Sequence, residues 1–295
     1  MPEIRRTQIP FRSRNPYQQP APPGRTPAIR PPFGRTQLGA QIQRGYYPRK
    51  PRIKKRALCI GLNYPGTPYQ LYGCVADSDA IAERLESAKF SVSQITSAIT
   101  PEELAEYLEA VAVASGPNDV FYFTYSGHGT QLWDNSGEEA DLYDEALCLW
   151  DRPGGIQCIT DDTLRELLQK IRGSVFVILD SCYSGGMERA ALPPGMKRKS
   201  IPFDSSWSVY GNEFESAREK RLTTIHRQYN LYACLESEVS YDTGGGGIFT
   251  TSLLHNVNAG RRTIAKAMKG AAKDCGGWQT PRYAIQGGSA AKNLF

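Results

Sequence analysis

Histidine is scarce in this sequence, and the cysteines lack the spacing of a metal site or a disulfide framework. The 295 residues include three histidines and seven cysteines, with no CxxC pair and no clustering of His with Cys. A structural zinc site and a disulfide framework are therefore not expected. Most of the thiols should instead be small buried side chains in a reducing compartment.

Long apolar segments are also missing. The chain has no apolar run of about 20 residues and no secretory signal pattern, so we expect no membrane span. We expect a cytoplasmic monomer, with the nucleus as an alternative location. Because 40% of the residues are hydrophobic, the chain has enough apolar material for one large domain or two small ones.

Acidic residues are almost absent from the first 56 positions. This segment carries fourteen Lys or Arg residues against the single acid Glu3, a net charge of +13, so residues 57–295 carry −8 of the total of +5. It also holds eleven of the twenty prolines. With so few apolar residues it cannot bury enough surface to offset the entropy lost on ordering. We therefore predict a disordered Pro/Arg-rich prodomain over 1–56, either a solvated leader or an arm that binds SH3-like domains, anionic surfaces or RNA.

The rest of the chain alternates between apolar runs and helical patterns. Strands are expected at 56–64, 90–96, 119–129, 145–150, 174–182 and 229–236, and helices at 74–88, 100–114, 161–171 and 247–260. This alternation predicts an α/β fold with a mainly parallel central sheet and helices on both faces. We expect Asp77 and Ser78 to cap the first helix and Thr100 to cap the second. Residues 187–228 are expected to form an exposed, protease-sensitive loop.

Two of the predicted strands end in unusual polar residues. Ser126 and His128 follow one strand in "YSGHG", and Asp180 and Cys182 follow another in "DSC". Ligands bind at the carboxyl ends of strands in open α/β sheets, and a nearby base turns a thiol into a nucleophile. We therefore predict a His128–Cys182 pair, with the backbone N–H groups of Gly129 and Cys182 as donors to an oxyanion. The alternative is a hydrogen-bonded core histidine and a buried cysteine.

The motifs together resemble those of the metacaspases, which are caspase-fold cysteine peptidases. The resemblance covers most of residues 57–290 and rests on "LYGCVADSDA", "YSGHGTQ", "GEEADLYDEAL", "ITDD", "DSCYSGG" and "QTPRY". It implies a peptidase domain over 57–295, with a p20-like part at 57–186, a connector at 187–228 and a p10-like part at 229–295. The Pro-rich extension and modest connector are similar to type I members. The resemblance also implies peptide-bond hydrolysis, with His128 as base and then acid and Cys182 as the residue that is acylated.

The same resemblance assigns Cys74, Asp77, Ser126 and Asp180 to the S1 pocket. Two carboxylates in a recessed pocket repel each other unless a cation lies between them. A substrate Arg or Lys would supply that cation, so we expect protein or peptide substrates with Arg or Lys at P1. The alternative for Asp77 is a plain helix cap.

The resemblance further implies calcium ligands at Asp144, Asp161 and Asp162, since calcium prefers oxygen donors. Arg189 stands where the family has a further aspartate, and Asp161 and Asp162 could simply favour the N-terminus of their helix. We therefore predict a calcium-assisted cysteine endopeptidase that is made as a zymogen and cuts its own connector. The candidate cleavage sites follow the basic residues Lys197, Arg198, Lys199, Arg218, Lys220 and Arg221. The alternatives are a legumain- or gingipain-like peptidase and a catalytically vestigial adaptor that acts through its Pro/Arg-rich arm.

Overall fold

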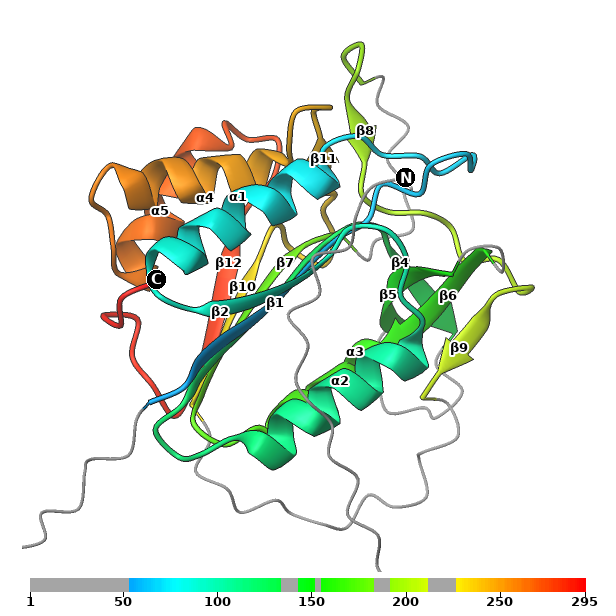
Figure 1. The fold of residues 1–295 in the computed structure, drawn as a ribbon. Helices are drawn as coiled ribbons and strands as arrows, with labels where there is room; N and C mark the ends of the chain where they lie inside the picture. The colour runs from blue at the N-terminus through cyan, green and yellow to red at the C-terminus, as the bar shows by residue number, and fades with distance from the viewer. Residues whose placement is uncertain (1–52, 134–142, 152–154, 183–191, 212–226) are drawn as a thin grey trace, which may run out of the picture. The chain divides into compact units, whose positions relative to one another are not determined.

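A central sheet of six strands organises the computed structural model, which describes residues 53–133, 143–151, 155–182, 192–211 and 227–295 (Figure 1). The strand order is β12-β10-β7-β3-β1-β2. The parallel strands are β1 (Lys55–Gly61), β2 (Ser91–Ile95), β3 (Val120–Ser126), β7 (Ser174–Asp180) and β10 (Arg227–Tyr232), while β12 (Arg282–Gln286) runs antiparallel to β10. The predicted α/β class with a mainly parallel sheet is confirmed.

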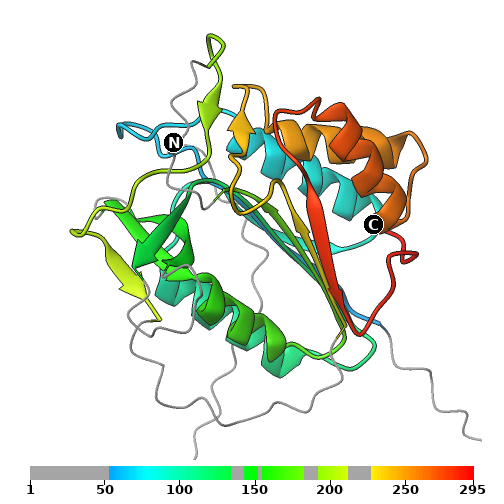
Figure 2. The ribbon, with the colours of Figure 1, turned by 180° about the vertical axis from the view of Figure 1, so that it is seen from behind.

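Helices cover both faces of this sheet, as Figures 1 and 2 show from opposite sides. One face packs against α1 (Cys74–Ser87), α4 (Ile248–Asn258) and α5 (Ile264–Asp274), and the other against α2 (Pro101–Ala114) and α3 (Asp161–Gln169). Each face has its own cluster of buried apolar side chains. The sheet is therefore buried on both sides, which explains why its strands read as continuous apolar runs rather than alternating ones.

Two smaller sheets complete the described part of the chain. One contains β4 (Gly129–Trp133), β5 (Tyr143–Asp151), β6 (Gly155–Thr160) and β9 (Ser208–Tyr210), and the other pairs β8 (Lys197–Arg198) with β11 (Tyr241–Asp242). Of these strands the sequence predicted only β5. The helix α5 and the edge strand β12 were not predicted either.

The second predicted helix begins as expected. The Thr100 side chain accepts a hydrogen bond from the Glu103 N–H, and the Glu103 carboxylate accepts one from the Thr100 N–H. This reciprocal pair satisfies two N–H groups that a helix start would otherwise leave without partners. Pro101 is the first residue of the helix, where its missing N–H costs nothing.

The prediction that Asp77 and Ser78 cap the first helix is wrong. The N-cap is Gly73, and Asp77 lies inside α1, three residues after its first residue. The N-terminus of α1 is instead capped from the end of β1: the Asn63 side-chain oxygen accepts hydrogen bonds from the N–H groups of Cys74 and Val75. Asp77 is thereby left to point into the protein.

The prediction of an exposed loop over 187–228 holds for 193–195, 202, 204–206 and 208, which are exposed, but not for the rest of the described residues 192–211. This stretch contributes β8 and β9 to the two smaller sheets, and Lys199 is fully buried. The physical reason is an electrostatic contact with the end of the central sheet, which is described below. Arg218, Lys220 and Arg221 lie outside the described residues.

The predicted prodomain over 1–56 falls almost wholly outside the described residues; β1 begins at Lys55. Residues 53–295 form one compact unit. None of the helices in the described part of the chain is long and apolar enough to cross a membrane.

Candidate active site

The carboxyl ends of β1, β3 and β7 lie side by side. In the sheet register Gly61 pairs with Ser126, and Ser126 pairs with Asp180. His128 and Cys182 each follow two residues after these strand ends, and both side chains are buried. The predicted residues from two distant parts of the sequence therefore meet at one edge of the sheet.

Two buried tyrosines fix the backbone of His128. The Tyr64 hydroxyl accepts the His128 N–H at 2.9 Å, and the Tyr125 hydroxyl donates to the His128 carbonyl at 2.7 Å. The space left for Gly127 is very small: a Cβ there would lie 2.5 Å from the Tyr125 hydroxyl and 2.7 Å from the Tyr64 hydroxyl. Gly127 is therefore needed for this close approach.

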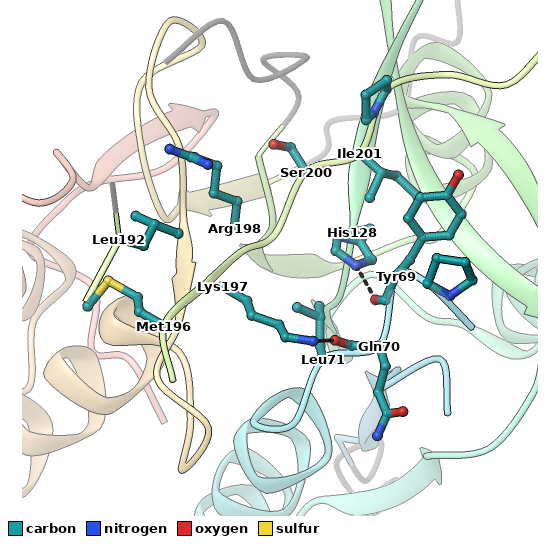
Figure 3. Close-up of a pocket in the computed structure, with 12 residues that line it drawn as sticks. Tyr69, Gln70, Leu71, His128, Leu192, Met196, Lys197, Arg198, Ser200 and Ile201 are labelled. Atoms are coloured by element: carbon teal, nitrogen blue, oxygen red, sulfur yellow. Dashed lines mark hydrogen bonds between the residues drawn. The ribbon is translucent and has the colours of Figure 1, made fainter. Parts of the chain in front are cut away.

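The His128 ring is oriented by a backbone carbonyl. Its Nε2 lies 2.7 Å from the Tyr69 oxygen, a contact drawn in Figure 3, and its Nδ1 is buried without a hydrogen-bond partner. Since a carbonyl only accepts, we assign the proton to Nε2, which leaves the Nδ1 lone pair available. Burial lowers the pKa of His128 to about 4, so the ring is neutral at pH 7 and can accept a proton.

The Cys182 thiol is 1% exposed, and His128 Nδ1 is not hydrogen-bonded to it in this structure. Burial of the thiol opposes its ionisation, whereas a hydrogen bond with the Cys234 thiol favours it. The net effect is a pKa below the ordinary value for cysteine. The Cys182 sulfur also donates to the Ser240 carbonyl oxygen at 3.8 Å, so in this structure it is a buried thiol that follows the end of β7.

The chain's own Lys199 occupies the pocket between the two aspartates. Its ammonium lies 2.8 Å from Asp77 Oδ2, 3.1 Å from Asp180 Oδ1 and 2.9 Å from Ser126 Oγ, and the side chain is 0% exposed. All three N–H bonds of the ammonium therefore have an acceptor. Although burial disfavours the ammonium, the carboxylates of Asp180 and Asp77 raise the pKa of Lys199 well above its usual range. Cys74 lies in the same pocket, in hydrogen-bond contact with Ser126.

Neighbouring groups hold the two carboxylates in place. Asp180 accepts hydrogen bonds from the Ser240 hydroxyl at 2.6 Å and from the Thr250 hydroxyl at 2.6 Å. Asp77 Oδ1 accepts the Gly247 N–H at 2.8 Å. A Cβ at Gly247 would lie 2.4 Å from the Lys199 amine, so a side chain there would fill the space that the lysine takes.

The backbone of Lys199 is bound as closely as its side chain. Its carbonyl oxygen accepts the Gly129 N–H at 3.0 Å and the Cys182 N–H at 3.3 Å, and its own N–H donates to the Ser240 carbonyl at 2.8 Å. The preceding residues form β8, which pairs antiparallel with β11. The segment thus crosses the site as an added strand, and the two N–H groups predicted to bind an oxyanion hold a peptide carbonyl.

A cavity of about 380 Å³ opens beside His128, between residues 68–71 and 192–202 (Figure 3). On its wall, the Lys197 amine donates to the Gln70 carbonyl and lies 4.6 Å from the centre of the Tyr72 ring. Ser200, the residue after the bound lysine, also lines this cavity. The cavity is therefore part of the cleft that the segment crosses.

Comparison with known proteins identifies the family of this chain. The model of the caspase domain matches residues 54–283. The chain belongs to the caspase-domain family. A solved structure of a protein from Geobacter sulfurreducens shares this arrangement, with a TM-score of 0.63 and 27% identity over 80% of this chain and 94% of that one.

Among curated proteins this caspase-domain chain is similar to metacaspases. It is 33% identical to Metacaspase-6 of Arabidopsis thaliana over 170 residues, which is 52% of this chain and 45% of that protein. It is 31% identical to Metacaspase-1 of Cryptococcus neoformans over 186 residues, which is 56% of this chain and 41% of that protein. The resemblance to metacaspases is confirmed, although the matches span less than half the length of these relatives.

Several groups of the caspase-domain site have no signal in the sequence. The Tyr69 and Ser240 carbonyls are backbone groups, which any residue type could supply, and the Gly247 N–H belongs to one of several consecutive glycines. Tyr64 reads as part of an apolar strand end. Lys199 was noticed as one basic residue among several in the connector, but nothing in its local sequence distinguishes it from Lys197 or Arg198.

The predicted calcium ligands come from two neighbouring elements, β5 and the start of α3. Ala146 pairs with Thr160, which brings Asp144 next to the start of α3, where Asp161 and Asp162 are the first two residues. Both of these aspartates form ion pairs with Arg165, Asp161 at 3.5 Å. No group of three or more His, Cys, Asp or Glu side chains positioned to hold a metal occurs in the described residues. The donor chemistry suits calcium, but the carboxylates as placed bind Arg165 and do not fit a ready-made site.

We predict that His128 in the Cys182→Ala variant, which cannot react, titrates near pH 4 rather than near the ordinary value of about 6.5. Burial disfavours the charged ring. The contribution of neutral His128 to the free energy of unfolding is therefore lost as the pH falls from about 6.5 to about 4. An NMR titration of the imidazole resonances measures the midpoint. The added change Lys199→Ala removes a nearby positive charge and the anchor of the covering segment, so it should raise the midpoint. An unshifted midpoint in the single variant would contradict the assignment.

Proposed function

We propose that the chain is a cysteine endopeptidase that cleaves after Lys or Arg, with Cys182 as nucleophile and His128 as base. The single observation that carries the proposal is the placement of Lys199. Its side chain lies between two carboxylates while its carbonyl oxygen accepts two backbone N–H groups beside the thiol. This is the position of a substrate residue whose peptide bond is about to be attacked.

The proposed mechanism assigns one group to each chemical step. The Cys182 sulfur gives its proton to His128 Nδ1 and attacks the carbonyl carbon of the P1 residue, and the oxygen becomes an anion held by the N–H groups of Gly129 and Cys182. His128 then returns the proton to the leaving amine, which leaves an acyl-enzyme. Water activated by the neutral His128 hydrolyses the thioester and restores the thiol.

The preference for a basic P1 residue follows from charge. Asp77 and Asp180 are buried, and each accepts hydrogen bonds from groups that stabilise the ionised form. A lysine or arginine side chain supplies the positive charge that two buried carboxylates require. An aspartate side chain would add a third negative charge, so peptides with Asp at P1 should not react.

The bound segment implies that the uncut chain is a zymogen. With Lys199 in place, no other basic side chain can enter the pocket. Hydrolysis of the Lys199–Ser200 bond would remove the covalent link that holds the segment across the cleft. Self-processing at this bond would therefore convert a blocked site into an open one.

Calcium assistance rests on the resemblance and on the closeness of Asp144 to Asp161 and Asp162. In the structure Arg165 is the cation that these aspartates bind. Calcium prefers six to eight oxygens, so its binding would require Arg165 to move away. Calcium and Arg165 would then compete for the same carboxylates.

The first prediction concerns specificity. Asp180→Ala or Asp77→Ala should lower kcat/KM for an Arg-coumarin peptide by an amount equivalent to about 2–5 kcal/mol, because each removes one member of a buried charge pair. Asp79→Asn, an exposed carboxylate on the same helix as Asp77, is the control and should leave kcat/KM unchanged. Cys182→Ala should be inactive. Efficient cleavage after Asp by the wild type would refute the pocket assignment.

The second prediction concerns the site of self-processing. Incubated wild-type protein should give a new N-terminus at Ser200, and the larger fragment should hold both His128 and Cys182. Lys199→Ala should abolish this cut, whereas Lys197→Ala and Arg198→Ala should retain it, because neither side chain lies between the aspartates. N-terminal sequencing of the fragments distinguishes these outcomes. Equal cutting of Cys182→Ala would show that another protease is responsible.

The third prediction concerns calcium. Calorimetric titration of the Cys182→Ala variant with calcium should show binding, which the double change Asp161→Ala and Asp162→Ala should abolish. Arg165→Ala should strengthen binding because it removes the competing cation, and magnesium serves as the control ion. Absence of binding to any of these variants, with self-processing unaffected by a chelator, would remove calcium from the mechanism.

A further inference from the structure

A second thiol lies directly against the proposed nucleophile. The Cys182 and Cys234 side chains are hydrogen-bonded to each other, and both are buried. The Cys234 sulfur also lies 3.9 Å from the Ser181 carbonyl oxygen, which belongs to the peptide that joins Ser181 to Cys182. Neither the fold nor the proposed peptidase step accounts for this second thiol.

The sheet brings the two cysteines together. Tyr232 of β10 pairs with Leu179 of β7, and the next residue, Ala233, donates to the Leu179 carbonyl at 3.0 Å. Cys234 therefore continues along the strand that borders Cys182, one residue out of register. Both cysteines lie just past the ends of these strands, and the Cys234 sulfur contacts the peptide that precedes Cys182 within one buried cluster. A disulfide requires Cα atoms about 4.4–6.8 Å apart, which the proposal expects of this pair.

The surroundings hold the second thiol in place. Cys234, Cys182, Val239 and Tyr241 form one buried cluster. The Cys234 thiol also lies 3.6 Å from the Glu238 carbonyl oxygen, across the turn that leads to β11. Val239, Tyr241 and the Glu238 carbonyl thus hold the Cys234 side chain next to Cys182.

The two thiols differ in their chemistry. The contact with Cys182, together with burial, raises the pKa of Cys234 far above its ordinary value, whereas that of Cys182 is lowered. Their positions differ as well: the Cys182 N–H binds the Lys199 carbonyl in the cleft, whereas the Cys234 sulfur lies against the Ser181 and Glu238 carbonyl oxygens. A thiolate is the form that a peroxide oxidises, and a neighbouring thiol can then resolve the product.

A second pair of thiols in the chain provides a contrast. Cys148 and Cys158 pair across β5 and β6 and are also hydrogen-bonded. Burial raises the pKa of Cys148 well above its ordinary value, and both side chains are completely buried. Contact alone therefore does not distinguish the Cys182–Cys234 pair. Its position does, because Cys182 follows a strand end and binds the segment in the cleft, whereas Cys148 and Cys158 lie within the main apolar core.

We propose that Cys182 and Cys234 form a reversible disulfide when a hydroperoxide oxidises the nucleophile. The Cys182 thiolate attacks the peroxide and takes one oxygen to become a sulfenic acid, and the other oxygen leaves as water or alcohol. The Cys234 sulfur then attacks the Cys182 sulfur, and the sulfenic oxygen leaves as water with the Cys234 proton. The two thiols supply the two electrons that reduce the peroxide. A dithiol reductant reduces the disulfide again. The disulfide therefore inactivates the site reversibly and protects Cys182 from irreversible oxidation.

The inference rests on the proposed function only because Cys182 is the reactive thiol. The test treats the full chain with a slight excess of hydrogen peroxide, blocks free thiols and maps disulfides by mass spectrometry. We expect a Cys182–Cys234 cross-link and no Cys148–Cys158 cross-link. In protein that has first cut itself after Lys199, hydrolysis of an Arg-coumarin peptide should fall on oxidation and return with dithiothreitol.

Cys234→Ser and Cys234→Ala are the decisive variants. In both, Cys182 should be converted to sulfinic or sulfonic acid, and dithiothreitol should not restore activity. Cys158→Ser, which removes one thiol of the other pair, should behave like the wild type. Absence of the Cys182–Cys234 cross-link, or equal recovery of the Cys234 variants, would overturn the proposal. A cross-link in a chain that hydrolyses no peptide would uphold the thiol pair and overturn the peptidase instead.

Discussion

Two buried carboxylates that require a cation between them are the constraint on which the described structure depends. Asp77 comes from α1 and Asp180 from the end of β7, and both are almost wholly removed from water. Left without a counter-charge, such a pair would favour a shared proton or an open pocket. Lys199 resolves this conflict from within the chain. In doing so it holds the segment that contains β8 across the cleft, with its own side chain buried.

This arrangement explains why the strand ends carry both recognition and chemistry. Ser126 and Asp180 pair in the register of the sheet, and His128 and Cys182 follow each of them by two residues. The distance between the cation-binding groups and the thiol is therefore set by the backbone of a rigid parallel sheet. Tyr64 and Tyr125 then fix the turn that carries His128. In the proposed peptidase, the same two strands would fix both the cation-binding groups and the thiol.

Local patterns allowed much of the fold to be predicted. The Thr100 cap and the apolar run of β7 are encoded within a few neighbouring residues, so the sequence alone sufficed for them. Features that depend on partners far along the chain could not be predicted this way. Asn63 caps a helix that starts eleven residues later, and Lys199 is buried only because Asp77, 122 residues away, accepts its charge. A basic residue in a connector looks exposed until its partners are known. The meeting of polar strand ends was predictable because the carboxyl ends of parallel strands lie at the same edge of a sheet. The backbone carbonyl that orients His128 and the one that binds the segment could not be predicted, because a carbonyl is present in every residue.

The antiparallel pairing of β8 with β11 has a consequence for what the cleft can admit. The partner of β11 is held through its main chain, with the Lys199 N–H on the Ser240 carbonyl and its own carbonyl on two N–H groups. A polypeptide that follows this path must be fully extended over at least three residues before the reactive bond. Helices and tight turns cannot offer their backbone in that shape, because their N–H and C=O groups are already engaged with each other. Under the proposed function, the conformation of a target would therefore count as well as its lysine or arginine, and linkers between folded domains would meet both conditions.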